Sequence, residues 1–541
     1  MKKIFIPKLL ASLFVIGTLP GCTDLKDEAY TTIIASKFNP TQNDIAAITG
    51  AAYSNWRFVM LDWDGYWRAQ ELSADQEVIP GRPNGWVDGG VYRRIHEHKW
   101  TSEEGIVRNT WTRTYAGITN CNRIIYQIES NLIPVGESKN AVLAELKVLR
   151  ASYYYILLDM FGNVPLVTQF DLPEGFLPKQ STRKEIYDFV VKEIESNIAL
   201  LSTKNDVSTY GKFNQWAAYT LLAKVYLNAE IYAGTPQWQK AADAADKVIA
   251  SGLFTLESNQ KNVFLTENQN SKEIVWAFPL DEKYTNNWNA FDLHMQSLSP
   301  ENQATYNLRS APWGGMSAIP QFISSFDKDD VRMKQNWIQG PQYSSSGVPL
   351  ICTMGSFKDK PLNYINEVPS IAGAESVHGY RLGKFEIKLG AEVQLSNDFP
   401  IFRYADVLFI KAESLLRLGR ADEAATLVTQ VRKRAFPSNP DKAVVTGAQL
   451  RGGSTYAYGR RDTAQSTQEG GDDITYGRFL DELGWEFDQE GRRRQDLIRF
   501  GVFAKKSWLS HSATNDLRKN LFPIPVVEMN KNSNLQQNPG Y

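Results

Sequence analysis

The chain has 541 residues, of which 43% are hydrophobic and 22% charged, and its formal net charge is −1. This length and apolar content suffice for a large buried core, and length alone would allow about two to four domains. The near-neutral net charge gives no indication of the strongly basic face that is typical of nucleic-acid-binding proteins.

The N-terminus has the pattern of a secretion signal. Three lysines precede an apolar run over residues 9–19, which is shorter than the ~20 residues that span a bilayer. The run ends at Gly21-Cys22, and a small residue directly before a cysteine resembles the lipobox of bacterial lipoproteins. We expect residues 1–21 to be a lipoprotein signal peptide and Cys22 to carry the lipid. An ordinary signal peptide with an incidental cysteine is the alternative.

Residues 22–40 are then predicted to form a lipidated tether. Asp24, Asp27 and Glu28 resemble the surface-export signal of Bacteroidetes lipoproteins, although unrelated charges in a solvated tether would look the same. Removal of the signal peptide deletes three lysines and no acidic residue, which moves the net charge from −1 to −4. Because no later segment has the length and apolarity of a spanning helix, we expect the lipid to be the membrane attachment.

Amphipathic helices are predicted where apolar residues recur at three- and four-residue steps. The segment after Thr182 also has a capping-box signature, because Glu185 occupies the third helical position. Cys121 falls within a helical pattern and is expected to be a small core residue, and no spacing argues for its pairing with Cys352. The expected helices cover residues 44–60, 105–129, 140–161, 183–201, 213–232, 238–251, 406–417 and 421–434.

Successive helices pair in the manner of tetratricopeptide units. In residues 403–436, Ala412 and Ala424 fall where the two helices of that repeat approach closely, and Leu418-Gly419-Arg420 supplies the turn. About four irregular repeats are predicted, with a coincidental run of helical hairpins as the alternative. The expected fold is mainly α, with a helical scaffold over about 41–251 and 403–436.

Two segments lack this periodicity, about 62–100 and about 255–400. The second is rich in Gly, Pro, Ser, Asn and aromatic residues, with a strand-like run at Ile274–Phe278. Since loops on a rigid frame commonly carry binding residues, we expect both segments to be ligand-binding insertions. They would belong to a single domain over residues 41–541 that closes with the segment 476–541.

Four sequence signatures carry a resemblance to the SusD/RagB family of outer-membrane nutrient-binding lipoproteins of Bacteroidetes. They span nearly the whole mature chain in the order that the family shows. Gly484-Trp485 departs from the pattern, since the family often has an arginine there. The signatures are Cys22-Thr-Asp-Leu with Tyr30-Thr-Thr-Ile and Gly50-Ala-Ala-Tyr53; Leu149-Arg-Ala-Ser-Tyr-Tyr-Tyr through Phe161-Gly-Asn-Val-Pro-Leu166; Phe402-Arg-Tyr-Ala-Asp-Val-Leu408 with Ala412-Glu413; and Glu490-Gly-Arg-Arg-Arg-Gln-Asp-Leu-Ile-Arg499 with Phe522-Pro-Ile-Pro525 and Asn538-Pro-Gly-Tyr541.

The resemblance implies a SusD-like fold with a tetratricopeptide-like scaffold. It implies a lipoprotein on the outer face of the outer membrane that captures a polysaccharide or oligosaccharide. The glycan would pass to a SusC-like TonB-dependent transporter. Such proteins bind glycans without cleaving them, so neither enzyme activity nor a cofactor is expected.

Residues with catalytic potential are better explained as structural. No phosphate-binding loop, nucleophile elbow or zinc-binding helix motif occurs. His96-Glu97-His98 is interpreted as an exposed polar strand rather than a metal site, and Asp472-Asp473 as a solvated turn rather than glycosidase acids. Four residues at helical steps are interpreted as a buried polar network that ties the C-terminal helix to the loops. They are Glu486, Glu490, Arg493 and Asp496.

Aromatic residues outside the helical frame are the predicted glycan-binding residues. Trp86, Trp288 and Trp313 each lie beside turn-forming or small residues, where a large ring gains little core contact. An indole offers a flat apolar face to the C–H face of a sugar ring. Three such faces could form a flat surface for a β-glucan such as xyloglucan, whereas a curved arc would suit starch. The predicted hydrogen-bonding neighbours are Asn84, Asn287, Asp64, Tyr66 and Arg82.

Two other functions remain open from the sequence. One is a tetratricopeptide lipoprotein that acts as a scaffold in outer-membrane assembly. The long aromatic-rich insertion argues against it, because such scaffolds are smaller. The other is a surface endo-glycosidase, which would need two acids that face one groove.

Overall fold

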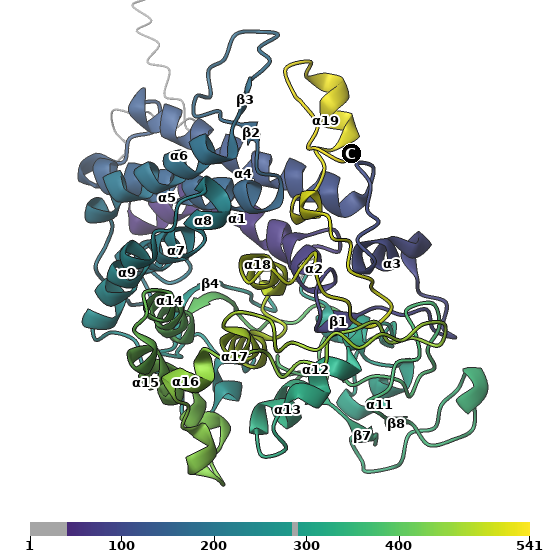
Figure 1. Ribbon diagram of the computed structural model, residues 1–541. Helices are drawn as coiled ribbons and strands as arrows, with labels where there is room; N and C mark the ends of the chain where they lie inside the picture. Colours follow the sequence, from purple (N-terminus) through teal and green to yellow (C-terminus); the bar gives the residue numbers. More distant parts are fainter. Residues whose placement is uncertain (1–40, 284–289) are drawn as a thin grey trace, which may run out of the picture.

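The computed structural model describes residues 41–283 and 290–541. The predicted signal peptide, Cys22 and the tether therefore lie outside the described residues. The earlier helices form one half of the molecule and the loop-rich insertion the other, with α17 (Gly477–Phe487) and α18 (Arg493–Arg499) between them (Figure 1). In the described part of the chain, no helix is long and apolar enough to cross a membrane.

The first helices pack in series. α1 (Gln42–Leu61) lies against α4 (Gly105–Glu129), α4 against α5 (Lys139–Met160), and α5 against α6 (Arg183–Asn197). Thr182 and Glu185 form the predicted capping box at the start of α6, which satisfies backbone N–H groups that would otherwise lack partners. Cys121 is buried in α4, and both Cys121 and Cys352 are free.

The remaining frame helices close this half of the molecule. α7 (Gln215–Leu227), extended by α8 (Ala229–Ala233), packs on α9 (Trp238–Ala250). α14 (Tyr404–Arg417) packs on both α9 and α15 (Ala421–Arg432). The predicted helices and their neighbours are confirmed, and the number of tetratricopeptide repeats stays a prediction.

A two-stranded antiparallel sheet marks where the long insertion leaves and rejoins the frame. β4 (Ile274–Phe278) pairs with β10 (Phe399–Arg403), with Phe278 opposite Phe399 and Ile274 opposite Arg403. Every residue of β4 is buried, as the β-branched and aromatic composition of this run predicts. The two ends of the segment between them are therefore held side by side.

Among the described residues between these strands the chain forms short elements, and the other connections are similar. Within residues 41–283 and 290–541, four further two-stranded sheets pair β1 with β5, β2 with β3, β6 with β9, and β7 with β8. The short strands are β1 (Glu77–Val78), β2 (Val164–Pro165), β3 (Gln180–Ser181), β5 (Ser317–Ala318), β6 (Trp337–Ile338), β7 (Gly340–Pro341), β8 (Asn363–Tyr364) and β9 (Arg381–Leu382). The short helices are α2 (Tyr66–Glu71), α3 (Val91–His96), α10 (Leu293–Ser297), α11 (Gln303–Tyr306), α12 (Pro320–Ser325), α13 (Val331–Asn336), α16 (Gly447–Leu450) and α19 (Val526–Lys531).

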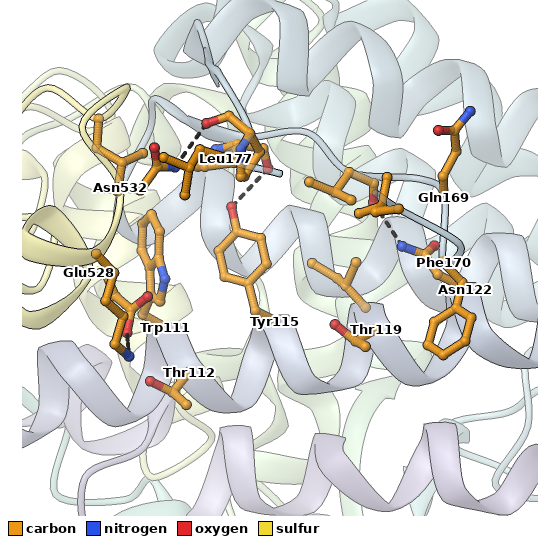
Figure 2. Close-up of a pocket in the computed structure, with 17 residues that line it drawn as sticks. Trp111, Thr112, Tyr115, Thr119, Asn122, Gln169, Phe170, Leu177, Glu528 and Asn532 are labelled. Atoms are coloured by element: carbon orange, nitrogen blue, oxygen red, sulfur yellow. Dashed lines mark hydrogen bonds and ion pairs between the residues drawn. The ribbon is translucent and has the colours of Figure 1, made fainter. Parts of the chain in front are cut away.

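One contiguous hydrophobic core extends from Ile45 to Leu535 and includes both halves of the molecule. The connection between β2 and β3, residues 166–179, runs over the outer face of α4 (Figure 2). Tyr115 of α4 donates a hydrogen bond to the carbonyl of Pro165 at the start of this connection, over 2.8 Å.

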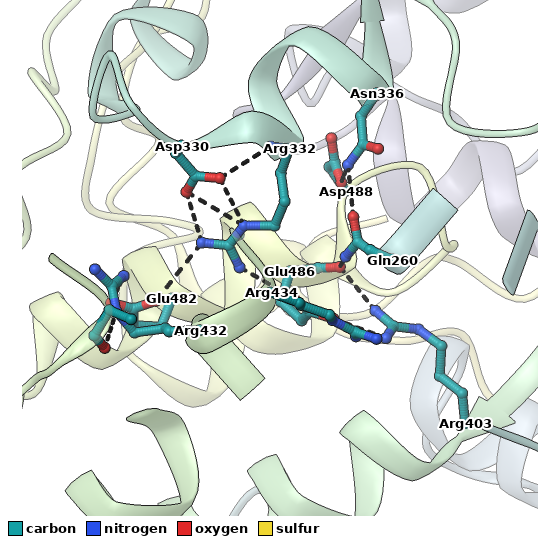
Figure 3. A network of polar contacts seen from close by, with 12 residues as sticks. Gln260, Asp330, Arg332, Asn336, Arg403, Arg432, Arg434, Glu482, Glu486 and Asp488 are labelled. Atoms are coloured by element: carbon teal, nitrogen blue, oxygen red, sulfur yellow. Dashed lines mark hydrogen bonds and ion pairs between the residues drawn. The ribbon is translucent and has the colours of Figure 1, made fainter. Parts of the chain in front are cut away.

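A network of buried charges centres on Glu486 of α17 (Figure 3). Its carboxylate accepts hydrogen bonds from Arg332 of α13 at 3.0 Å, from Arg403 of β10 at 2.8 Å and from Arg434 at 2.7 Å. These cations hold the pKa of Glu486 well below its usual range against the opposing effect of desolvation. One carboxylate thus joins the insertion, the helical frame and the C-terminal segment.

The same network continues along the chain. Glu490 accepts from Arg403 at 2.7 Å and from Lys384 at 2.5 Å. Arg493 pairs with Asp75 at 2.7 Å, and Asp496 pairs with two further arginines, Arg492 at 3.0 Å and Arg499 at 2.7 Å. The interpretation of the four spaced residues as a structural network is confirmed.

The expectation of an exposed strand at residues 96–98 is wrong. α3 ends at His96, and both His96 and His98 are buried. The His98 ring stacks on Phe503 at a centroid distance of 4.2 Å and lies 4.1 Å from His511. Burial lowers the pKa of His96 to about 4 and that of His98 to about 3, so both imidazoles are neutral. Their packing partners are distant in sequence, which is why local polarity predicted the wrong environment.

Glu77 of β1 is a buried carboxyl group without a hydrogen-bond partner for either oxygen among the described residues. The carboxyl groups of Glu71 and Asp488 lie nearby, as do the cations of Lys384 and Arg68. Desolvation, and then repulsion from Glu71 and Asp488, raises the pKa of Glu77 well above its usual value. The folded protein therefore favours the protonated form of Glu77.

Replacement of Glu486 by glutamine should destabilise the fold strongly. Glu486→Gln keeps the shape of the side chain but leaves three buried guanidinium groups without their shared negative charge. Breaking a buried ion pair from one side costs about 3–5 kcal/mol, and chemical denaturation of the variant measures the loss. Asp327→Asn, at an exposed pair with Lys442, is the matched control and should cost about 1 kcal/mol or less. Equal effects of the two substitutions would contradict the role of the network.

Glu77→Gln should stabilise the protein at alkaline pH. Because the pKa of Glu77 is raised in the folded state, its stabilising contribution is complete below the unfolded pKa and is lost as pH rises through the folded pKa. We expect the variant to exceed the wild type by about 1–3 kcal/mol near pH 8, with no such gain near pH 4. Thermal unfolding between pH 4 and pH 8 tests the sign of the stability difference between the variant and the wild type. Glu174→Gln, at an exposed position, is the control. A variant less stable than the wild type at every pH would refute it.

Candidate functional site

The candidate site lies where two loops distant in sequence leave the same end of one small sheet. Glu77 of β1 is opposite Ala318 of β5, and the two strands run antiparallel. In such a pair the segment after one strand lies next to the segment before the other. The loop after β1 carries Trp86, and the loop before β5 carries Trp313.

Three half-buried tryptophans meet at this point, and we call Trp63, Trp86 and Trp313 the indole cluster. Trp313 is central, with ring centroids 5.2 Å from Trp63 and 6.4 Å from Trp86. The ring planes are inclined by 69° and 52°. The ring of Tyr92 in α3 also contacts Trp86, with ring centroids 5.5 Å apart. The three rings are therefore inclined to one another. The flat surface that the sequence suggested for Trp86, Trp288 and Trp313 stays a prediction, because Trp288 lies outside the described residues.

Trp63 was missed by the sequence analysis. It lies in the turn Asp62-Trp63-Asp64-Gly65 directly after α1. Turn residues beside a large ring are the same signal that identified Trp86, so this residue could have been found. Its indole N–H donates to Asp292 over 2.6 Å, and Asp292 also accepts from Arg68 at 3.2 Å. The ring is thus held in place by a buried carboxylate.

Asn84 and Arg82 hold the two loops together. The Asn84 amide donates to the carbonyls of Trp313 and Gly314, the latter over 2.7 Å. Arg82 is buried and donates to the carbonyl of Gly315 at 2.9 Å and to the Ser317 hydroxyl at 3.1 Å. Both were predicted to bond a ligand. In the structure their donors are directed to the protein, where they fix the relative position of Trp86 and Trp313.

Gly315 is required for the close approach of the two loops. A Cβ atom at this position would lie 2.3 Å from the six-membered ring of Trp86, well inside van der Waals contact. The backbone of Gly315 also donates to the carbonyl of Gln296 at 2.9 Å. Any side chain at this position would displace Trp86.

The other predicted site residues are placed differently. Asp64 is half-buried beside Trp63 in the chain, and its carboxylate accepts from Asn109 at 2.9 Å. Burial, and then the neighbouring Asp62, raises the pKa of Asp64. Tyr66 is only 4% exposed and donates to Asp159 over 3.1 Å, so its burial in α2 argues against a ligand contact. Trp288, Asn287 and Cys22 lie outside the described residues.

Among residues 41–283 and 290–541, no pair of acidic side chains at the cluster faces a common groove. The same residues supply no set of metal ligands there. Asp292 is buried and bonded to Trp63 and Arg68, and Asp64 is bonded to Asn109. Across the same residues, no three His, Cys, Asp or Glu side chains are grouped to hold a metal ion. Asp472 and Asp473 are exposed, and Asp473 pairs with Lys506 at 2.7 Å. The arrangement is suited to stacking against a ligand.

Two family models match the chain. The model described as "SusD family" matches residues 272–541, and that described as "Starch-binding associating with outer membrane" matches residues 61–227. The starch-binding protein SusD of Bacteroides thetaiotaomicron is 24% identical over 440 residues, which are 74% of this chain and 72% of that protein. SusD-like protein P25 of Formosa agariphila is 22% identical over 548 residues and covers 97% of each chain.

Solved structures show the same fold. The surface glycan-binding protein A of Bacteroides thetaiotaomicron, solved in complex with laminarihexaose, superposes with a TM-score of 0.69 at 17% identity, over 92% of this chain and 100% of that one. The surface glycan-binding protein A of Bacteroides uniformis gives 0.67 at 20% identity, over 92% and 99%. The family models, the relatives and the fold agree with the four signatures of the sequence. The chain belongs to the SusD/RagB family of glycan-binding proteins associated with the outer membrane.

Proposed function

We propose that this protein is a non-catalytic lipoprotein of the cell surface that captures polysaccharide or oligosaccharide on the indole cluster. The observation that carries the proposal is the convergence of Trp63, Trp86 and Trp313 on loops outside the helical frame, with ring centroids 5.2 and 6.4 Å apart. A sugar ring presents an apolar C–H face to such rings while its hydroxyl groups stay in water. Each stacking contact is worth on the order of 1 kcal/mol beyond the area it buries.

The inclination of the rings bears on the kind of glycan. Planes inclined by 52° and 69° can each stack on a different sugar only if the chain turns from one ring to the next. A β-1,3-linked glucan or starch curves in this way, whereas the backbone of xyloglucan is an extended ribbon. We therefore propose a curved glucan as the preferred ligand, with xyloglucan the weaker one. The laminarihexaose complex and the laminarin-binding SusD-like protein of the same fold support a glucan.

The protein would be anchored through lipid on Cys22 and face the outside of the cell. The small residue before Cys22 and the acidic residues behind it support this anchor. From there it would deliver glycan to a SusC-like, TonB-dependent transporter, the partner that the family resemblance implies. Because the protein would bind the glycan without cleaving it, the glycan would reach the transporter intact.

Loss of the central ring should weaken glucan binding the most. Trp313 contacts both other indoles, so Trp313→Ala removes one stacking face and the support of two more. We expect about a tenfold or greater rise in Kd for laminarin, equivalent to about 1.4 kcal/mol, by isothermal titration calorimetry. Gly315→Ala keeps all three rings but displaces Trp86, and it should also weaken binding. The matched control is Trp216→Ala, a half-buried indole on α7 in the helical half. An unchanged Kd for laminarin in Trp313→Ala would show that the indole cluster does not bind the glucan.

A panel of glycans should separate the proposed ligand class from the alternatives. Residues 23–541 would be run through native gels that contain laminarin, starch or xyloglucan, with reducing-end release measured in parallel. We expect retardation by laminarin and starch, weaker retardation by xyloglucan, and no released sugar. Release of sugar would instead favour a surface endo-glycosidase. Unretarded migration in a wide panel of glycans would contradict the proposed function.

A further inference from the structure

A surface pocket adjoins the loop that carries Trp86. Its volume is about 570 Å³, and it lies between the loop after β1 and residues 369–378, which precede β9. We call it the His378 pocket. Trp86 is not among its lining residues, so the pocket and the indole cluster are separate surfaces that share one loop. The lining includes Arg82, Pro83, Val87, Ala372, Glu375 and His378.

Backbone hydrogen bonds hold the two walls of the His378 pocket together. The N–H of Gly81 donates to the carbonyl of Ile371 at 3.0 Å, and the N–H of Ala374 donates to the carbonyl of Gly81 at 2.8 Å. A Cβ atom at Gly81 would lie 2.8 Å from the carbonyl oxygen of Ala372, so a glycine is needed for this close approach. The main chain therefore fixes the shape of the pocket.

A buried arginine couples the His378 pocket to the indole cluster. Arg82 is 8% exposed and donates to the carbonyl of Gly315, in the Trp313 loop, at 2.9 Å. The same guanidinium donates to the carbonyl of Glu375, in the pocket wall, at 2.6 Å. Because a planar guanidinium holds its donors in a fixed geometry, the pocket keeps a fixed position relative to the Trp313 loop.

The His378 pocket is within reach of a glycan chain that stacks on Trp86. Pro83 precedes Trp86 by three residues, which span at most about 10 Å, and Val87 follows it directly. Both Pro83 and Val87 are exposed and give the pocket an apolar edge next to the ring. A chain that leaves Trp86 in this direction therefore enters the pocket along the same loop.

The His378 side chain supplies a hydrogen-bond donor to the pocket. Its Nδ1 accepts the backbone N–H of Glu375 at 2.8 Å. A ring nitrogen that accepts carries no proton, so the proton of the neutral imidazole is on Nε2. Burial, and then the charge of Arg82, lowers the pKa of His378, which keeps the ring neutral near pH 7. Since Nδ1 is occupied, Nε2 is the nitrogen that can donate to a ligand.

The Glu375 carboxylate supplies the complementary acceptor. It is half-buried and accepts from the hydroxyl of Ser356 at 2.9 Å and from the backbone N–H of Ser356 at 3.2 Å. A carboxylate has about four lone-pair sites, so these two bonds orient the group and leave it able to accept from a ligand. A Cβ atom at Gly355 would clash with this carboxylate, and the adjacent glycine therefore allows Ser356 to approach.

The His378 pocket thus combines one donor, one acceptor and apolar surface. A few convergent polar groups on an apolar lining are typical of ligand pockets, and a sugar unit offers hydroxyl groups that donate and accept beside apolar C–H groups. We propose that the pocket binds one sugar unit of the glucan chain that stacks on the indole cluster, with hydroxyl groups bonded to Glu375 and to Nε2 of His378. Because the indole cluster holds the same chain, this second contact rests on the proposed function.

Chain length separates the His378 pocket from the indole cluster in a binding experiment. Laminarin is long enough to reach both, whereas the disaccharide laminaribiose stays on the rings. We expect His378→Ala and Glu375→Gln each to raise the Kd for laminarin about fivefold or more through the lost hydrogen bond, by isothermal titration calorimetry. The Kd for laminaribiose should be unchanged. Gly373→Leu should act in the same way by filling the pocket, and it should fold, because a Cβ atom at this exposed glycine meets no atom within 4 Å.

The matched control is Glu367→Gln, an exposed carboxylate two residues before the pocket wall that does not line the pocket, and it should bind laminarin as the wild type does. A wild-type Kd for laminarin in all three pocket variants, with binding weakened in Trp313→Ala, would overturn the pocket and leave the proposed function intact. An equal loss for laminaribiose and laminarin would also overturn it, because the variants would then have disturbed the rings. Wild-type binding in Trp313→Ala would instead refute the proposed site, and the second contact with it.

Discussion

The buried charge network around Glu486 is the constraint on which the rest of the structure depends. Three guanidinium groups share its carboxylate, and they come from α13 in the insertion, from β10 at the edge of the frame and from Arg434 after α15. Desolvation of this many charges is tolerable only while every partner is present. The network therefore fixes the positions of three segments that are far apart in sequence. Because α17 lies between the two halves of the molecule (Figure 1), the C-terminal segment unites the fold.

Such an anchor is needed because the insertion cannot hold itself together. Its own sheets have two strands of two residues each, and an isolated pair of strands is marginal in water. Hydrogen bonds from buried side chains supply the stabilisation that these short sheets lack. Lys384, for example, is fully buried and donates to the backbone carbonyls of Glu486 and Asp488, each over 2.9 Å. The indole cluster is built on the same principle, with Arg82, Asn84 and Asp292 as the anchoring residues.

Local sequence predicted the features that depend on local forces. The helices follow from periodic apolar residues, the start of α6 from the Thr182 and Glu185 capping box, and β4 from its composition. Trp86 and Trp313 could be named because turn residues flank them, but their contact depends on the pairing of β1 with β5. That pairing joins two-residue strands about 240 positions apart, too short to leave a pattern that sequence periodicity can detect.

The residues whose environment the sequence predicted wrongly were misjudged for one physical reason. Arg82, Asn84, Tyr66 and His98 are polar, and polar residues in loop-like sequence are mostly exposed. Here each is turned inward to a partner that is distant in sequence, as Tyr66 is to Asp159. A loop-rich insertion has many backbone carbonyls without strand partners, and buried polar groups must be satisfied. Polar side chains in such a segment are therefore recruited to the interior.

This recruitment separates the residues that position the site from those that would touch a ligand. Arg82 and Asn84 bond to backbone carbonyls of the Trp313 loop, so their contribution does not depend on which ring stands on that loop. The indoles themselves are half-buried. Replacing Trp86 or Trp313 with another aromatic ring leaves the bonds of Arg82 and Asn84 in place, whereas replacing Trp63 removes its bond to Asp292. A frame held by buried charges and loops held by side-chain-to-backbone bonds can thus present different aromatic surfaces on one architecture.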